Sequence, residues 1–207
     1  RPPRSTQGVS SAASDVYKRQ VLLAVGARTT PFMTCRYDEL TAAKNGLSIE
    51  TADLSKVFDL MNRVDPDSEA YQKRADQLRG YTNWEKASEE AFDQQVRLLV
   101  ILDGYIEEFE PAVIGLRCWT EFQELRHISP CASVSFLNHG RDDGHVLPTA
   151  CEVDLGTGLT MHVLRRYSGD AVACQDWNNN WADNETNKFA FMHCGPHDTA
   201  WLVPGSH

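Results

Sequence analysis

The spacing between apolar residues changes along the chain, and these changes predict the order of strands and helices. Val21 to Val25 is a continuous apolar run that ends at Gly26, which is typical of a short buried strand. After the turn pair Asn45-Gly46, the stretch "LSIETADL" alternates as a second short strand. A loop connects the two, so the pattern begins as strand, loop and strand.

Helical spacing follows Asp53, which is placed to cap a helix that begins at Leu54 and ends before Pro66. From Ser68 to Glu108 the chain is rich in helix-forming residues, with a break near Gly80. The core stripe of this region is expected at five apolar positions: Phe92, Val96, Leu99, Ile101 and Ile106. Pro111 then stops the helix.

The second half of the chain reads as strand, loop, helix and strand. The segment "AVIGLRCW" is predicted as a buried strand that turns polar and aromatic at its end, and a loop follows it. A helix is expected from about Val153 to Tyr167 with Gly169 as its stop, then a strand over Ala171 to Cys174. A further strand is expected in "NKFAFMHCG". Strands joined through helices by short links predict an α/β fold with a parallel, Rossmann-like sheet.

The chain divides into three parts by pattern. Residues 1–20 lack apolar periodicity, and "SSAASDVYKRQ" resembles translated read-through of a sequencing adapter, so we interpret them as a non-native scar; the alternative is a genuine disordered tail. Residues 21–168 are predicted to form the α/β domain. Residues 169–207 are predicted to begin a C-terminal domain.

Composition narrows the class of protein. A hydrophobic share of 42% and a charged share of 24% are typical of a soluble globular protein. The net charge of −9 and the scattered basic residues argue against a nucleic-acid partner. No apolar run approaches the roughly 20 residues of a membrane span. The six cysteines show no CxxC spacing, which favours reduced thiols and a cytoplasmic location.

Three side chains that bind metals fall at the ends of predicted elements. Glu152 precedes the predicted helix, Asp176 follows one strand and His193 follows the next. Two carboxylates and one imidazole suit Mn²⁺ or Mg²⁺ better than Zn²⁺. The amides of Asn178, Asn179 and the adjoining Asn180 would fit as partners of a polyhydroxylated ligand.

Each of these residues also has a structural interpretation. Glu152 is favourable beside a helix N-terminus, Asp176 can cap a loop, and asparagine runs are common in turns. A competing chemistry is a cysteine nucleophile, because Cys194 adjoins His193 and Cys151 adjoins Glu152. Sequence neighbours in strands point to opposite faces, which disfavours this alternative.

Several separate segments resemble one known family in the same order. "ACEVDLGTGLTMHVL", "DWNNN" and "FMHCG" resemble the L-fucose isomerase-like family, which is related to L-arabinose isomerases. "VGARTTPFMTCRYDE" and "CWTEF" resemble the domain that precedes them, so the likeness extends over about residues 21–200. The resemblance implies that residues 21–168 correspond to the second N-terminal domain of the isomerase and that the chain is truncated at both ends.

The resemblance also implies an activity: an aldose–ketose isomerase that uses Mn²⁺ and an enediol. Glu152 and Asp176 then correspond to the metal ligands that also move the proton, and His193 to a ligand of the arabinose branch. Trp119 would offer an apolar face to the sugar, or else simply pack at its strand end. A small sugar such as L-fucose is the implied partner and a homo-oligomer the implied assembly. The alternative is a non-catalytic, sugar-binding relative.

Overall fold

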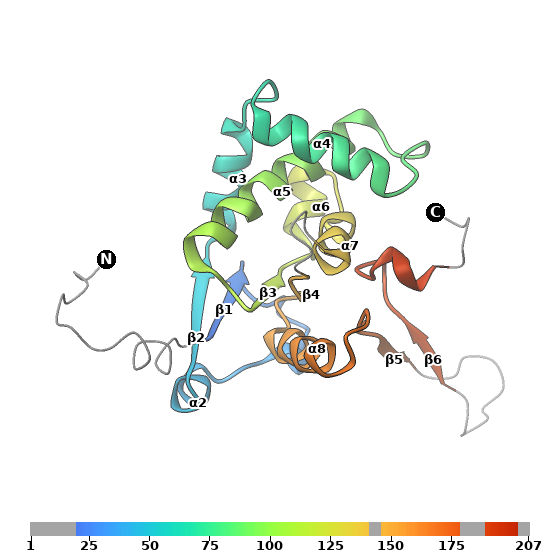
Figure 1. Ribbon diagram of the computed structural model, residues 1–207. Helices are drawn as coiled ribbons and strands as arrows, with labels where there is room; N and C mark the ends of the chain where they lie inside the picture. The colour runs from blue at the N-terminus through green and yellow to red at the C-terminus, as the bar shows by residue number, and fades with distance from the viewer. Residues whose placement is uncertain (1–19, 141–145, 179–188, 203–207) are drawn as a thin grey trace, which may run out of the picture.

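The computed structural model describes residues 20–140, 146–178 and 189–202, and its centre is a four-stranded parallel sheet (Figure 1). The strands lie in the order β2-β1-β3-β4. Their bounds are Gln20–Val25 for β1, Leu47–Ala52 for β2, Val113–Leu116 for β3 and Thr149–Cys151 for β4. All three neighbouring pairs are parallel, which confirms the predicted α/β class.

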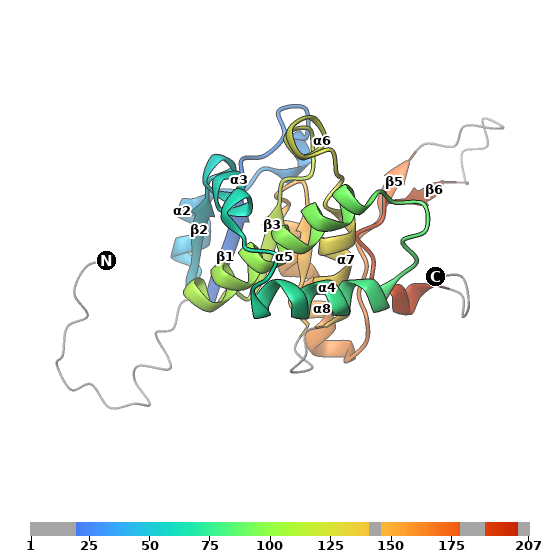
Figure 2. The same ribbon diagram turned by 90° about the horizontal axis from the view of Figure 1, so that it is seen from above.

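Helices cover both faces of this sheet (Figures 1 and 2). One face carries α3 (Leu54–Arg63), α4 (Glu69–Tyr81), α5 (Glu89–Phe109), α6 (Glu121–Arg126) and α7 (Cys131–His139). The other face carries α2 (Glu39–Lys44) and α8 (Leu155–Ser168). The described residues also include two short 3-10 helices, η1 (Met33–Cys35) and η2 (Thr199–Trp201).

The core is divided in two by the sheet. Leu23 and Val25 of β1 belong to the larger cluster under α3, α5 and α7, while Leu22 and Ala24 belong to the smaller cluster under α8. Because successive side chains point to opposite faces and both faces are covered, the strand reads as a continuous apolar run. The predicted helical stripe is confirmed in part: Phe92, Val96 and Leu99 are buried, and Ile101 and Ile106 are partly buried.

Local signals set most helix boundaries. The Asp53 carboxylate accepts a hydrogen bond of 2.7 Å from the Ser55 amide and caps α3 as predicted. Gly169 ends α8 in the left-handed conformation, with φ of 75°. The predicted break near Gly80 corresponds to the connection between α4 and α5.

The structure corrects the prediction in four places. The expected loop after β3 contains α6, α7 and β4, and residues 171–174 are not a strand. Instead β5 (Asp176–Asn178) and β6 (Ala190–Met192) form a separate antiparallel pair, not a continuation of the parallel sheet. Aromatic contacts explain this pairing, because the Trp177 ring lies 5.6 Å from the Phe191 ring across the strands. Gln20, assigned above to the scar, is the first residue of β1.

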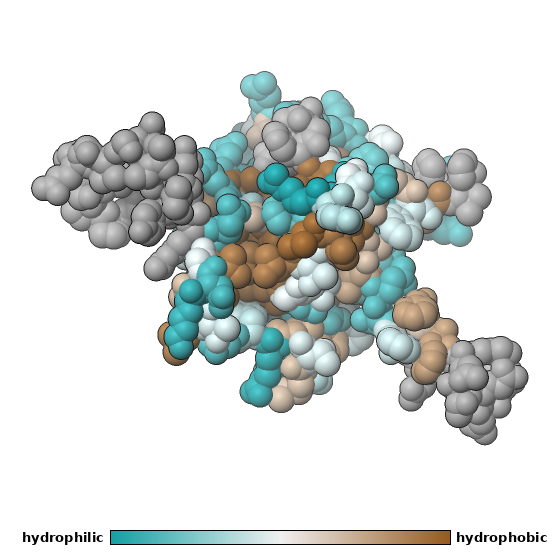
Figure 3. All heavy atoms as spheres, turned by 60° about the horizontal axis from the view of Figure 1, so that its bottom comes forward, coloured by the Kyte–Doolittle hydropathy of each residue, from teal (hydrophilic) through white to brown (hydrophobic). Residues whose placement is uncertain are grey.

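The face that carries α2 and α8 is less completely covered than the other. Figure 3 shows an apolar patch on this side, bordered by hydrophilic residues. Leu47, Ile49, Ala112 and Leu159 pack against the smaller core cluster there but are only partly buried. Among the described residues, no helix combines the length and the hydropathy that crossing a membrane would require.

Two glycines let α8 approach the sheet closely. A Cβ atom added to Gly158 would collide with Cγ1 of Val113, and one added to Gly115 would lie 2.9 Å from Cδ2 of Leu155. The contact between α8 and β3 therefore depends on the absence of side chains at both positions. This contact matters for function because α8 begins directly after the segment that carries Glu152.

We expect Gly158→Ala to lower the free energy of unfolding by about 1–3 kcal/mol, because the added methyl group overpacks the interface with β3. Gly104→Ala in α5 is the matched control, since no atom lies within 4 Å of its added Cβ. That control should gain up to about 1 kcal/mol from helix propensity. Urea denaturation measures both, and equal effects of the two variants would contradict the proposed packing.

Candidate functional site

The carboxyl ends of the parallel strands define the candidate site. β1, β3 and β4 run in the same direction, so the loops that follow Val25, Leu116 and Cys151 emerge at one edge of the sheet. In open α/β sheets, ligands bind outside this edge where the strand order reverses, which here is between β1 and β3.

Glu152 occupies a strained position at this edge. It directly follows β4, and both Glu152 (φ 64°) and Val153 (φ 59°) adopt the left-handed conformation. For a β-branched residue such as Val153 this conformation is a genuine outlier, and strain of this kind clusters at functional sites. Val153 is fully buried in the smaller core cluster. Burial of the valine therefore holds the strained turn that presents Glu152.

The surroundings of Glu152 raise the pKa of its carboxyl group. Partial burial is the largest cause, and the negative charges of Asp176 and Asp154 act in the same direction. A hydrogen bond of 3.5 Å from the Cys35 thiol to Oε2, and the charge of His193, act in the opposite direction. The structure thus brings Asp176 and His193 within electrostatic range of Glu152.

Antiparallel pairing brings Asp176 and His193 to neighbouring positions of the hairpin backbone. Asp176 is the first residue of β5 and pairs with Met192, and His193 follows Met192 directly. The prediction that Asp176 ends a strand was wrong, because the strand begins there. The prediction that His193 follows a strand was right. The hairpin, and not two parallel strand ends, brings the two residues together.

The three predicted ligands are of the chemical types that bind a divalent cation, but they are not grouped around a common point. Within residues 20–140, 146–178 and 189–202, no three His, Cys, Asp or Glu side chains are grouped so that they could hold an ion. Two of the predicted ligands have other partners: Nδ1 of His193 accepts a hydrogen bond of 2.9 Å from the Cys194 amide, and Glu152 accepts one from Cys35. Two carboxylates and an imidazole remain the ligand types that Mn²⁺ and Mg²⁺ accept.

Of the predicted sugar-binding residues, one lies at the same edge of the sheet and another lies in the hairpin. Trp119 lies on the same edge after β3 and is 43% exposed, and its ring contacts Phe32 at 5.7 Å. Its carbonyl accepts a hydrogen bond of 3.0 Å from the Thr29 hydroxyl, which ties the loops after β1 and β3 together. Asn178 lies in β5 opposite Ala190. Asn179 lies outside the described residues, as does Asn180.

Three residues around the candidate site were not predicted: Cys35 and Asp154 near Glu152, and His197 near His193. Burial, with the charges of Asp154 and Glu152, raises the pKa of Cys35 to about 12, so this thiol stays protonated and donates to Glu152. The His197 ring lies 5.8 Å from the His193 ring, and burial, followed by His193, lowers the pKa of His197. Cys35 is distant from Glu152 along the chain, and no local pattern links the two.

Helix α7 holds the segment that follows His193. The buried Asn138 amide donates to the carbonyls of Thr149 and Pro196, at 2.9 Å each, and its oxygen accepts from the Thr149 amide at 2.8 Å. Nδ1 of His139 lies 2.7 Å from the buried Asp198 carboxylate. We name this contact the α7 seam; it joins Ser135, Asn138 and His139 to Pro196, His197 and Asp198.

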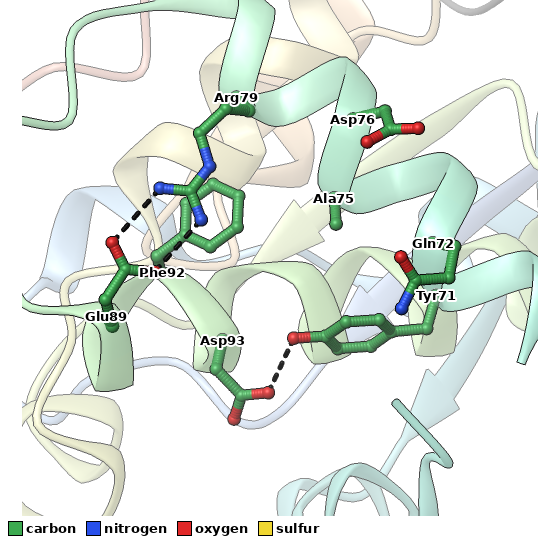
Figure 4. Close-up of a pocket in the computed structure, with 8 residues that line it drawn as sticks. All are labelled: Tyr71, Gln72, Ala75, Asp76, Arg79, Glu89, Phe92 and Asp93. Atoms are coloured by element: carbon green, nitrogen blue, oxygen red, sulfur yellow. Dashed lines mark hydrogen bonds and ion pairs between the residues drawn. The ribbon is translucent and has the colours of Figure 1, made fainter. Parts of the chain in front are cut away.

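A pocket of about 360 Å³ lies elsewhere, between α4 and α5 (Figure 4). Four of its polar side chains pair with one another in the pocket wall. Arg79 forms an ion pair of 3.0 Å with Glu89, and the Tyr71 hydroxyl donates to Asp93 at 2.7 Å. These internal pairings make the pocket a weaker candidate than the sheet edge.

Comparison with known proteins relates the chain to sugar isomerases. No protein-family model matches. The chain is 25% identical over 174 residues to the sulfoquinovose isomerases of Priestia aryabhattai and of Priestia megaterium (strain ATCC 12872 / QMB1551). That stretch is 79% of this chain but 35% of each relative, so the chain spans about a third of the length of these relatives.

A shorter match agrees with this relationship. The sulfoquinovose isomerase of Alkalicoccus urumqiensis is 29% identical over 98 residues, which is 44% of this chain and 19% of that protein. The named relatives support the sugar-isomerase part of the predicted resemblance. They do not support L-fucose isomerase in particular.

Glu152→Gln should stabilise the chain at neutral pH. The raised pKa means that the folded state disfavours the carboxylate, so the stability contributed by the protonated form is lost as the pH rises from about 4 through the raised pKa. Glutamine carries no charge and avoids this loss. The gain in unfolding free energy over the wild type should therefore be larger at pH 7 than at pH 4.

Urea denaturation at the two pH values measures this gain. Glu107→Gln is the matched control, because Glu107 is an exposed carboxyl on α5. A gain for Glu152→Gln that is equal at both pH values, or matched by the control, would argue against a disfavoured Glu152 carboxylate.

Proposed function

We propose that this chain is part of an aldose–ketose isomerase in which Glu152 and Asp176 move the proton between adjacent sugar carbons. The observation that carries the proposal is the electrostatic proximity of these two carboxyl groups beyond the carboxyl ends of the parallel strands. The similarity to sulfoquinovose isomerases over most of this chain supports the same reaction class.

The reaction makes specific demands on these residues. One group must remove a proton from the carbon next to the aldehyde, and the proton must then reach the former aldehyde carbon through an enediol. A carboxylate whose pKa is raised by burial is a stronger base than a free glutamate, so Glu152 suits the removal step. Asp176, exposed on the hairpin, then suits the exchange of the hydroxyl proton.

A divalent cation is the second part of the proposal, with Mn²⁺ preferred and Mg²⁺ as the alternative. Glu152, Asp176 and His193 would hold it. Such a cation supplies positive charge that stabilises the oxygen anions of the enediol. The two carboxylates repel each other without it, which gives the chain an electrostatic reason to bind a cation at this place.

The substrate is proposed to be an aldose, and the named relatives make sulfoquinovose the first candidate. L-Fucose and related deoxy or pentose sugars are the second. Trp119 and Asn178 remain candidate contacts for the sugar. A homo-oligomer and a cytoplasmic location also remain proposals.

A non-catalytic sugar-binding relative is the competing function, and metal dependence separates the two. Mn²⁺ titrated into the chain in a calorimeter should bind, and Asp176→Asn should weaken binding by more than about 10-fold, since even changes in residues that only orient metal ligands cost about that much. Asp170→Asn, exposed on the preceding segment, is the matched control and should bind like the wild type. Equal binding by both variants would remove Asp176 from the ligand set.

The activity test uses a protein of the relatives' length that contains this chain. Ketose formation is measured from a panel of sulfoquinovose, L-fucose and L-arabinose, with Mn²⁺ and with EDTA. We expect EDTA to abolish turnover and Glu152→Gln to lower kcat by about 100-fold or more. Glu107→Gln is the control. Sugar binding that is indifferent to EDTA, without turnover, would instead establish the binding protein.

A further inference from the structure

Four of the six cysteine side chains form a row from the sheet edge to the hairpin. The thiol of Cys151, at the end of β4, interacts with those of Cys118 and Cys131, and Cys131 in turn interacts with Cys194. Cys118 and Cys151 are buried, Cys131 is half-buried and Cys194 is exposed. The isomerase proposed above uses none of these thiols.

Cys131 and Cys194 are the two members of the row that are not fully buried. The Sγ atoms of Cys131 and Cys194 are 4.0 Å apart. The backbone next to Cys194 also lies close to Cys131, because a Cβ atom built on Gly195 would lie 3.7 Å from Cβ of Cys131. A disulfide needs an S–S distance of about 2.05 Å, so the two sulfur atoms would have to approach by about 2 Å through side-chain rotation and a small backbone movement.

We propose that Cys131 and Cys194 are a redox-modification site and form a reversible disulfide when the chain meets a peroxide. The bond would tie the residue after His193 to the first residue of α7. It would therefore fasten the hairpin that carries Asp176 and His193 to the domain that carries Glu152.

The position of Cys131 supports it as the first residue to react. It is the first residue of α7, a nine-residue helix, and thiolates are stabilised at helix N-termini. Hydrogen bonds from Cys151 and then Cys194 lower the pKa of Cys131 to about 7, against the effect of burial. A substantial share of this thiol is thus ionised at neutral pH, and its partner Cys194 is open to solvent.

The chemistry balances with hydrogen peroxide as the oxidant. The Cys131 thiolate attacks one peroxide oxygen, an S–O bond forms, the O–O bond breaks and hydroxide leaves. The Cys194 sulfur then attacks the resulting sulfenic acid, the S–O bond breaks, the S–S bond forms and a second hydroxide leaves. With the two thiol protons, the hydroxides become two waters, and two electrons pass from sulfur to peroxide.

Other uses of the row fit the structure less well. In the described part of the chain, no three of these thiols are grouped closely enough to hold a metal ion. A Cys131–Cys151 disulfide would draw on a buried thiol at the end of a strand in the central sheet, and burial is among the causes that raise the pKa of Cys151. The pair with the exposed cysteine is therefore favoured, and the Cys131–Cys151 pair becomes an alternative result of the test.

Peptide mapping tests the proposal on the chain without any catalytic assay. The chain is treated with hydrogen peroxide, blocked with N-ethylmaleimide and digested with trypsin without reduction. Cleavage after Arg126, Arg141, Arg165 and Lys188 puts Cys118, Cys131, Cys151 and Cys194 on different peptides. We expect one linked pair that contains Cys131 and Cys194 and that separates on treatment with dithiothreitol.

Two variants sharpen the result. Cys194→Ser changes an exposed side chain and should abolish the linked pair, whereas Cys174→Ser, on the segment before the hairpin, should leave it intact. Oxidation should also raise the urea midpoint of the wild type but not that of Cys194→Ser, because the bond closes a long loop. A link from Cys131 to Cys151, a link between two chains, or blocked thiols at both Cys131 and Cys194 after oxidation would overturn the proposal.

Discussion

One buried amide connects the two halves of the candidate site. Asn138 donates to Thr149 and Pro196 and accepts from Thr149, so a single side chain fixes the start of β4 and the segment after β6. Glu152 lies three residues beyond Thr149, and His193 three residues before Pro196. Only a side-chain amide offers two donors and an acceptor in this way, and a buried network of this kind specifies one arrangement when all its members are satisfied.

The rest of the site follows from that constraint and from the sheet. Parallel strands deliver the loops after β1, β3 and β4 to one edge, where the Thr29 hydroxyl and the Trp119 carbonyl join two of them. Val153 is buried in a left-handed conformation, which turns Glu152 toward the hairpin. The strained backbone and the disfavoured carboxylate both occur at Glu152. Backbone strain and shifted pKa values of this kind cluster at functional sites.

Much of the fold could be predicted from the sequence because its signals are local. The apolar run of β1, the Asp53 cap and the Gly169 stop each act within a few residues. Helix α7 was missed because Ser133 to Asn138 are all buried, so no polar face gives it a helical period. Strand β4 has three residues, too few for a periodic pattern. The apolar run at residues 171–174 was predicted to be a strand. In the structure these residues are not in a strand, and β6 pairs with β5 instead.

The residues of the candidate site remain predictions, and their arrangement could not be predicted from the sequence. Glu152, Asp176 and His193 were named from their positions and from a family resemblance, and the structure brings them into electrostatic range by a hairpin that the sequence pattern did not reveal. Cys35 could not be predicted as a partner of Glu152, because the two residues lie far apart in the sequence. The lowered pKa of His197 could not be predicted either, because its main cause is burial.

The α7 seam has a consequence for biosynthesis. Domains fold from the N-terminus during translation, so the sheet, α7 and the Glu152 turn emerge from the ribosome before the hairpin and the segment with Pro196. Until that segment arrives, the amide of Asn138 lacks its acceptor on Pro196, and the Glu152 carboxylate lacks its charged neighbours Asp176 and His193. The candidate site is therefore completed only after the central sheet has been made, and a nascent chain paused before residue 176 would carry that sheet without the β5–β6 hairpin.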